Sequence, residues 1–125
     1  MGYARPTRFD NRVVLGSDGI GAAMLEEFQI AYLCHRAADV TASPETAWRW
    51  LENGRELIPE TKDDVVTWSY EPVEPWHVAF TPAIRPLRVE IGGEVMLEDG
   101  VATRVDPAEV RAKAAEQATR LHSRL

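Results

Sequence analysis

The stretch PLRVEIGGEVMLEDGVATRVDPAEVRAKAAEQATRLHSRL, residues 86–125, decides the fold class of this chain. Its first half alternates apolar and polar residues with the period of two that is typical of half-buried strands. Gly92-Gly93 and Asp99-Gly100 can adopt the positive φ angles of tight hairpin turns. The pattern therefore predicts three short antiparallel strands, over residues 87–91, 94–97 and 101–105.

The second half of the same stretch predicts a helix over residues 106–125. Asp106 suits the N-cap position, Pro107 suits the first helical position, and Glu109 completes a capping box. An apolar stripe at helical spacing runs through Val110, Ala114, Ala118, Leu121 and Leu125. Because the stripe is narrow and rich in alanine, the helix could dock on the chain's own sheet or pair closely with a helix of another subunit.

Two further helices are predicted upstream of the strands. The first covers residues 20–38, with Asp18 as a possible cap, and its second half is apolar around most of its circumference. Helices of that kind are mostly buried, so Cys34 and His35 are expected to face the core. The second covers residues 43–53 and has clear start and stop signals. They are Ser43 as the N-cap, Pro44 at the first position and Gly54 as the left-handed exit.

The region between residues 65 and 80 also alternates with a period of two. VVTWSY at residues 65–70 and WHVAF at residues 76–80 are predicted strands, and the prolines of EPVEP between them exclude a central strand there. The expected fold is α+β, with an extended arm before a single domain. The boundaries are 1–19 for the arm and 20–125 for the domain, with a helical part at 20–58, a β part at 65–105 and a C-terminal helix at 106–125.

The composition narrows the classes of protein that the chain can belong to. Its 125 residues suit one domain, and the single cysteine, Cys34, cannot form an internal disulfide. The net charge of −6 is shared evenly by the two halves, so a domain-wide basic surface for nucleic acid is missing. No apolar run approaches the roughly 20 residues that cross a bilayer, and no signal-peptide core is present. We expect a soluble cytoplasmic or virion protein without a membrane partner.

Signals of catalysis are sparse. The histidines His35, His77 and His122 fall in different predicted elements, and no serine lies in a nucleophile-elbow context. No glycine-rich loop has the form that binds phosphate. Acidic pairs such as Asp63-Asp64 lie in turn-like segments, where carboxylates stay solvated. The sequence therefore predicts no enzyme activity, no cofactor and no metal site.

The segment HRAADVTASPETAWRWLENGRELIP, residues 35–59, resembles the helix-turn-helix of MerR-type and excisionase-type regulators and of phage terminase small subunits. The resemblance implies that the second helix reads DNA. The residues expected to contact DNA are Ser43, Arg49, Arg55, Arg5 and Arg8. Two departures oppose this interpretation: Thr41 replaces the turn glycine, and the second helix carries more acidic than basic side chains, which phosphates repel.

Aromatic side chains next to rigid proline segments are good interface anchors as well as good core residues. The candidate interface residues are Trp48, Trp68, Trp76, Phe80 and Leu121. The leading hypothesis is a non-catalytic assembly subunit that binds other proteins as a homo-oligomer or in a larger particle, for example a phage head–tail connector or accessory protein. The alternatives are a small helix-turn-helix DNA-binding protein, and a toxin, antitoxin or inhibitor that binds one protein target.

Overall fold

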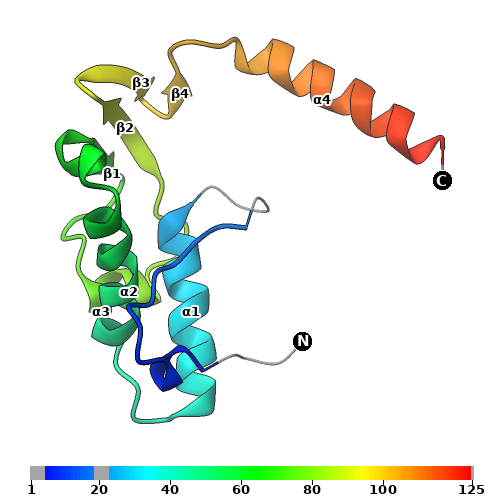
Figure 1. The fold of residues 1–125 in the computed structure, drawn as a ribbon. Coiled ribbons are helices and arrows are strands. Elements are labelled where there is room, and N and C mark those ends of the chain that lie inside the picture. Colours follow the sequence, from blue (N-terminus) through cyan, green and yellow to red (C-terminus); the bar gives the residue numbers. More distant parts are fainter. Residues whose placement is uncertain (1–4, 19–22, 125) are drawn as a thin grey trace. The chain divides into compact units, whose positions relative to one another are not determined.

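A computed structural model describes residues 5–18 and 23–124, and contacts group the chain into two units (Figure 1). Residues 1–62 and 70–84 form a helical unit. Residues 63–69 and 85–125 form a second unit, which contains the sheet and the C-terminal helix. Helices and an antiparallel sheet occur together, which confirms the predicted α+β class. Where the sequence predicts one domain after the arm, the structure groups these residues into two units.

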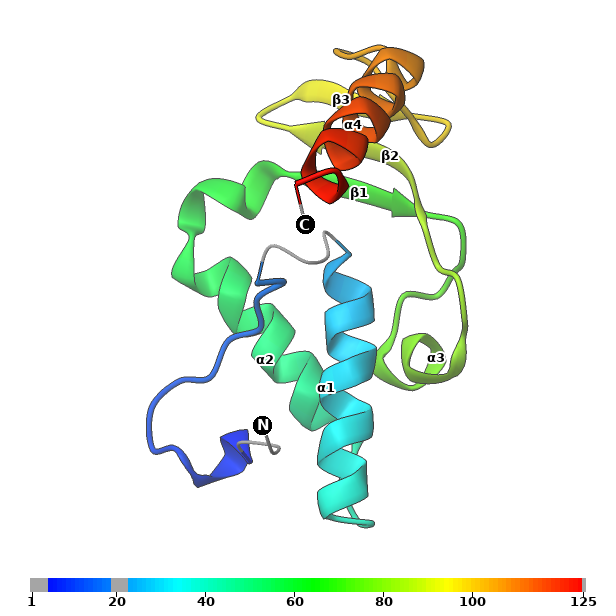
Figure 2. The same cartoon turned by 90° about the vertical axis from the view of Figure 1, so that its right-hand side faces the viewer.

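In the helical unit, α1 (Met24–Ala38), α2 (Pro44–Leu57) and α3 (Pro75–Phe80) pack against one another (Figure 2). Phe28 of α1 and Val78 of α3 are fully buried at the centre of this packing. The other buried apolar residues of the core are Leu25, Tyr32, Ala42, Pro44, Ala47, Trp50 and Ala79. The core of the described residues therefore lies between these helices.

The start of α1 differs from the prediction. The helix begins at Met24, and its N-cap residue, Ala23, provides no side-chain hydrogen bond. Asp18, the predicted cap, lies well before the helix with a φ of 49°, so that prediction is wrong. Ile20, which was expected in the first turn, falls outside the described residues.

α2 starts as predicted and ends later. The Oγ of Ser43 accepts a hydrogen bond from the backbone N–H of Glu45 at 3.3 Å, and Pro44 occupies the first turn. Gly54 does not end the helix, which continues to Leu57. Pro59 accounts for the later end, because the residue before a proline is disfavoured in helical conformation.

The predicted strand at residues 76–80 is wrong, because this segment forms α3. Pro75 lies at the start of α3, where its missing N–H costs nothing. The neighbouring residues Val78 and Ala79 are both buried, which a strand with alternating side chains could not achieve against one core. Gln29 Nε2 of α1 donates to the carbonyl oxygens of Val78 and Thr81, at 2.6 and 3.0 Å, and holds the end of α3 against α1.

The described part of the arm lies against the helical unit. A short 3-10 helix, η1, covers Pro6–Arg8. Asn53 Nδ2 of α2 donates to the carbonyl oxygen of Val13 at 2.8 Å, and Arg12 pairs with Glu56 of α2 at 2.8 Å. These contacts tie the arm to α2. A second 3-10 helix, η2 (Pro59–Asp63), follows α2.

The sheet is antiparallel in the order β1-β2-β3-β4. Its strands are β1 (Val65–Trp68), β2 (Pro86–Ile91), β3 (Glu94–Glu98) and β4 (Val101–Ala102). Gly92 and Gly93 have φ of 57° and 80°, and Asp99 and Gly100 have φ of 50° and 74°. Both predicted hairpin turns are therefore confirmed, although β4 ends three residues before the predicted boundary.

The two faces of the sheet differ in chemistry. Cross-strand register aligns Val66, Val89, Leu97 and Ala102 in one apolar row. On the other face Arg88 bonds to Glu90 and to Glu98. In this apolar row Val89, Leu97 and Ala102 are half-buried and Val66 is exposed.

α4 (Pro107–His122) starts with the predicted cap: Asp106 accepts from the N–H of Ala108 at 2.8 Å. Glu109 bonds to Lys113 at 2.7 Å, in the i,i+4 geometry of a helix surface. Every described residue from Ala108 to Arg124 is exposed. Within the described residues, α4 is thus a fully formed helix that buries no apolar face.

Candidate functional site

The predicted DNA-contact residues of α2 have different roles in the structure. The hydroxyl of Ser43 is used by the helix cap. Arg49 and Arg55 are exposed, and neither takes part in the ion pairs found among the described residues. The segment does have the order helix, short turn, helix that the resemblance implies.

The exposed row of α2 is acidic. At helical spacing it consists of Glu45, Arg49, Glu52 and Glu56. Glu45 accepts a hydrogen bond from the indole N–H of Trp76, Glu52 accepts one from Trp48 at 3.0 Å, and Glu56 pairs with Arg12. Even with Arg12 counted, two arginines among three carboxylates leave this row with a net negative charge, which DNA phosphates repel.

The structure brings Arg5 and Arg8 of the arm to the C-terminal end of α1. They line a shallow cavity of about 250 Å³ together with Thr7, His35, Ala38 and Asp39. The hydroxyl of Thr41 donates to Asp39 Oδ1 at 2.6 Å, and its backbone N–H donates at 2.9 Å. The Thr41 hydroxyl, followed by that N–H, lowers the pKa of Asp39 below its ordinary value. The carboxylate of Asp39 lines the same cavity as the two arginines and reduces the attraction of this site for anions.

The predicted interface aromatics of the helical unit divide into two kinds. Trp48 is half-buried, and its ring meets that of the fully buried Phe28 edge-on with centroids 5.0 Å apart. Trp76 and Phe80 of α3 are exposed by 52% and 64%, and their rings stack with centroids 6.2 Å apart. Phe80 also meets Tyr32 edge-on at 5.9 Å. Trp48 thus closes the core, whereas Trp76 and Phe80 present an aromatic surface.

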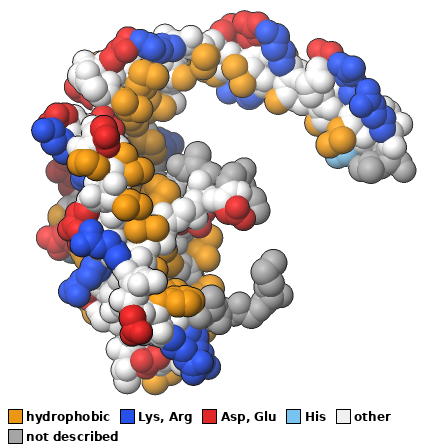
Figure 3. Space-filling model, viewed as in Figure 1, with side chains coloured by type: hydrophobic (Ala, Val, Ile, Leu, Met, Phe, Trp, Pro, Cys, Tyr) orange, Lys and Arg blue, Asp and Glu red, His pale blue; other side chains and the backbone are white. Residues whose placement is uncertain are grey.

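The two other candidate interface residues belong to the second unit. Trp68 is half-buried at the end of β1, opposite Pro86. Leu121 is 61% exposed on α4. The stripe that includes Val110, Ala114, Ala118 and Leu121 is therefore open, and Figure 3 shows hydrophobic side chains among charged ones on the surface of this helix.

α1 carries an exposed apolar face that the sequence analysis missed. One side of the helix is buried and consists of Leu25, Phe28, Tyr32 and His35. Another side consists of Ile30, Leu33, Cys34 and Ala37, and all of them are exposed. We name this second side the α1 outer face. The prediction that His35 faces the core is confirmed, and the same prediction for Cys34 is wrong.

A signal for the α1 outer face was present in the sequence. Its members recur at i, i+3, i+4 and i+7, the spacing of one side of a helix. The buried residues follow a similar spacing with a different phase. An all-round apolar helix predicts burial on every side, but in the described structure α1 has packing partners along only part of its surface.

Among the described residues, no group of three or more His, Cys, Asp or Glu side chains is arranged to hold a metal ion. Within residues 5–18 and 23–124, none of the helices combines the length and the hydropathy needed to cross a bilayer.

Comparison of the chain with models of protein families, with curated proteins and with solved structures gave no match.

Proposed function

We propose that this protein is a non-catalytic assembly subunit that associates with copies of itself through apolar helix faces. The observation that carries the proposal is the α1 outer face, where Ile30 and Leu33 are 56% and 57% exposed beside Cys34. Scattered exposed apolar residues are ordinary, whereas contiguous ones indicate an interaction site. The four residues of the α1 outer face are neighbours on one side of the helix, so they form such a contiguous surface.

Other surfaces of the chain support the same function. α4 leaves Val110 and Leu121 exposed by 52% and 61%. Trp76 and Phe80 form an exposed aromatic pair on α3, and aromatic residues are enriched at the energetic centres of protein interfaces. These surfaces have the chemistry of protein contacts.

A DNA-reading function has less support. The row of α2 that is open to solvent carries Glu45, Glu52 and Glu56 against Arg49. Affinity for DNA comes largely from lysine and arginine at the phosphates. The charge of the exposed row therefore favours the assembly function over the one implied by the helix-turn-helix resemblance.

The mass of the particle in solution tests the proposal. Sedimentation velocity over a wide range of concentrations is expected to give a species at a multiple of the 14.0 kDa chain mass. Leu33→Glu places a charge in the α1 outer face and is expected to shift this species toward the monomer. Val40→Glu is the matched control, because Val40 is 76% exposed in the turn after α1 and lies outside that face. A strict monomer at every concentration would contradict the proposal.

A further inference from the structure

We propose that α4 of one copy docks antiparallel on the α1 outer face of a second copy. The inference rests on the proposed function and names the two surfaces that meet. In this contact the apolar stripe of α4 covers the α1 outer face. The stripe consists of Val110, Ala114, Ala118 and Leu121.

α4 is only slightly longer than helices that are marginal in isolation, so packing of its apolar face is expected to supply most of its stability. Isolated helices are marginal in water below about 12–15 residues, and helices in proteins depend mainly on the packing of an apolar face. α4 has 16 residues, a side-chain cap at Asp106 and one surface ion pair, Glu109–Lys113. Its apolar stripe is nevertheless exposed along its described length. A partner surface that covers this stripe supplies apolar packing, which the cap and the ion pair of α4 do not provide.

The two faces match in the size of their side chains, and the stripe of α4 is long enough to cover the α1 outer face. At roughly 1.5 Å per residue, the α1 outer face from Ile30 to Ala37 spans about 10 Å and the stripe from Val110 to Leu121 spans about 16 Å, so the stripe also reaches Glu26. Each combines larger side chains with small ones; the small ones are Cys34 and Ala37 on α1, and Ala114 and Ala118 on α4. Small residues at a crossing let helix axes approach to about 8 Å, so the two faces can interlock closely.

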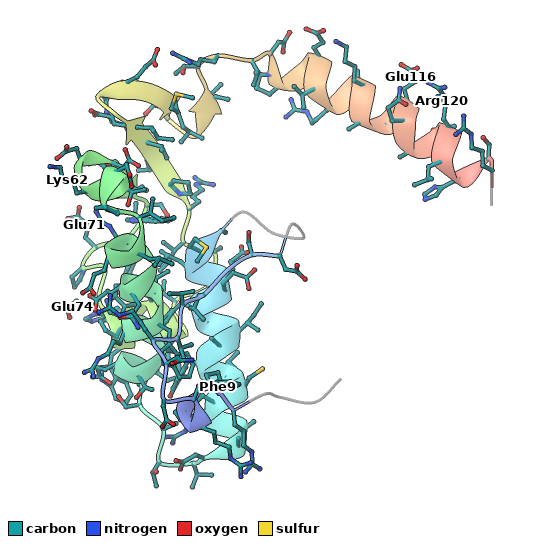
Figure 4. The ribbon with its side chains drawn as sticks, viewed as in Figure 1. Phe9, Lys62, Glu71, Glu74, Glu116 and Arg120 are labelled. Carbon is teal, nitrogen blue, oxygen red and sulfur yellow. The ribbon has the colours of Figure 1, made fainter. Side chains whose placement is uncertain are left out.

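Charge sets the direction of the contact. Glu26 and Glu27 lie four and three residues before Ile30, at the acidic N-terminal end of the α1 outer face. Arg124 lies three residues after Leu121, and Arg120 is its neighbour one turn earlier, at the basic end of α4. Figure 4 shows Arg120 projecting from the same side of α4 as Glu116. An antiparallel arrangement places the two arginines beside the two glutamates and opposes the helix dipoles.

The charge of the whole chain agrees with this pairing. Residues 107–125 carry four basic and two acidic side chains, a net charge of +2. The chain has 14 basic and 20 acidic side chains in total, so residues 1–106 have 10 and 18, a net charge of −8. A cationic helix is therefore attracted to the anionic remainder of another copy, and this attraction steers association.

A second copy is the occupant that the amount of surface favours. One helix pair buries less than the roughly 800 Å² per partner of a standard protein interface. Each copy has one α4 and one α1 outer face, so two copies that exchange helices, or a ring of copies, give every subunit two such contacts. Association between two copies therefore gives each subunit twice the buried area of a single helix pair.

The single native cysteine provides the test. In Ala114→Cys, mild oxidation is expected to join Cys34 of one copy to the new cysteine of another, because the antiparallel register places residue 114 opposite Cys34 and disulfides form when Cα atoms lie about 4.4–6.8 Å apart. Heavy-isotope and unlabelled copies are mixed and allowed to exchange before oxidation, and the linked peptides are weighed by mass spectrometry. Heavy–light peptides that join residues 34 and 114 are the expected result.

Matched variants complete the experiment. Ala112→Cys places the cysteine on the opposite side of α4 and is expected to give far less of the linked peptide. Arg120→Glu with Arg124→Glu in the Ala114→Cys background is expected to lower the yield several-fold. Adding Glu26→Arg with Glu27→Arg is expected to restore the yield.

Two outcomes would overturn the inference: linkage only between residues of the same isotope label, or a yield no higher than that of Ala112→Cys. The mass of the wild-type particle separates the two proposals. An oligomer without the cross-link rejects this contact and leaves the assembly function in place, whereas a monomer rejects both.

Discussion

Phe28 and Ile30 lie two residues apart on α1 and have opposite environments: Phe28 is 0% exposed and Ile30 is 56% exposed. Their side chains project from different sides of one helix, as its 3.6-residue period requires. Phe28 contacts Trp48 of α2 at a centroid distance of 5.0 Å. Ile30 belongs to the α1 outer face. Phe28 therefore stabilises the helical unit, whereas Ile30 is available to a partner.

Truncation of these two residues is expected to affect different properties. Phe28→Ala leaves a cavity in the core and is expected to lower the free energy of unfolding by about 3–5 kcal/mol. Ile30→Ala is expected to change it by less than about 0.5 kcal/mol in dilute solution, and to weaken self-association. Urea unfolding at low protein concentration, with sedimentation at high concentration, measures both effects. A large loss of stability in dilute Ile30→Ala would mean that Ile30 is buried within the monomer.

Two glycines with different backbone conformations are expected to respond in opposite directions to alanine. Gly54 lies inside α2 with open space around it, so Gly54→Ala is expected to raise the free energy of unfolding by about 0.5–1 kcal/mol. Gly93 has a φ of 80° in the hairpin turn, so Gly93→Ala is expected to lower it by about 1–2 kcal/mol. Thermal or urea unfolding of both variants provides the comparison. Destabilisation by Gly54→Ala would show that α2 ends at Gly54 after all.

The hydrogen bonds from Thr41 predict a change in the titration of Asp39. Its pKa lies below the ordinary value of 3.8, first because of the Thr41 hydroxyl and then because of the Thr41 N–H. A lowered pKa in the folded state means that the ionised carboxylate favours folding above the ordinary pKa. That contribution disappears as the pH falls through the folded-state value. Thr41→Val is expected to raise the pKa of Asp39, which carboxyl NMR titration measures.

The control for this titration is Thr61→Val, because the Thr61 hydroxyl donates to the carbonyl oxygen of Ile58 rather than to a carboxylate. It is expected to leave the pKa of Asp39 unchanged. An Asp39 titration curve that is identical in the wild type and in Thr41→Val would contradict the assigned cause.

The acidic row on α2 predicts that the purified chain does not bind duplex DNA. Glu45, Glu52 and Glu56 surround Arg49 on the exposed side, and phosphate contacts supply most of the affinity even in low salt. A mobility-shift assay at about 50 mM salt, where such contacts are strongest, is expected to show no complex. A complex that Arg49→Glu abolishes would establish the helix-turn-helix function instead.

Local signals in the sequence determined the elements whose stability comes from neighbouring residues. Ser43 with Pro44 and Asp106 with Pro107 start α2 and α4 as predicted, because an N-cap acts within one helical turn. The turns at Gly92-Gly93 and Asp99-Gly100 are also as predicted, since their positive φ angles are a local requirement. The α+β class followed from these signals.

Only the tertiary structure decided which apolar residues are covered. α3 alternates like a strand in sequence and folds as a helix, because Val78 and Ala79 are buried together beside α1 and α2. The periodicity of α1 cannot distinguish its buried side from its outer face, since both consist of apolar residues at helical spacing. Burial depends on which elements pack against a surface, and that depends on contacts between residues distant in the chain. For this reason Cys34, expected in the core, lies instead at the centre of the face proposed to meet another copy.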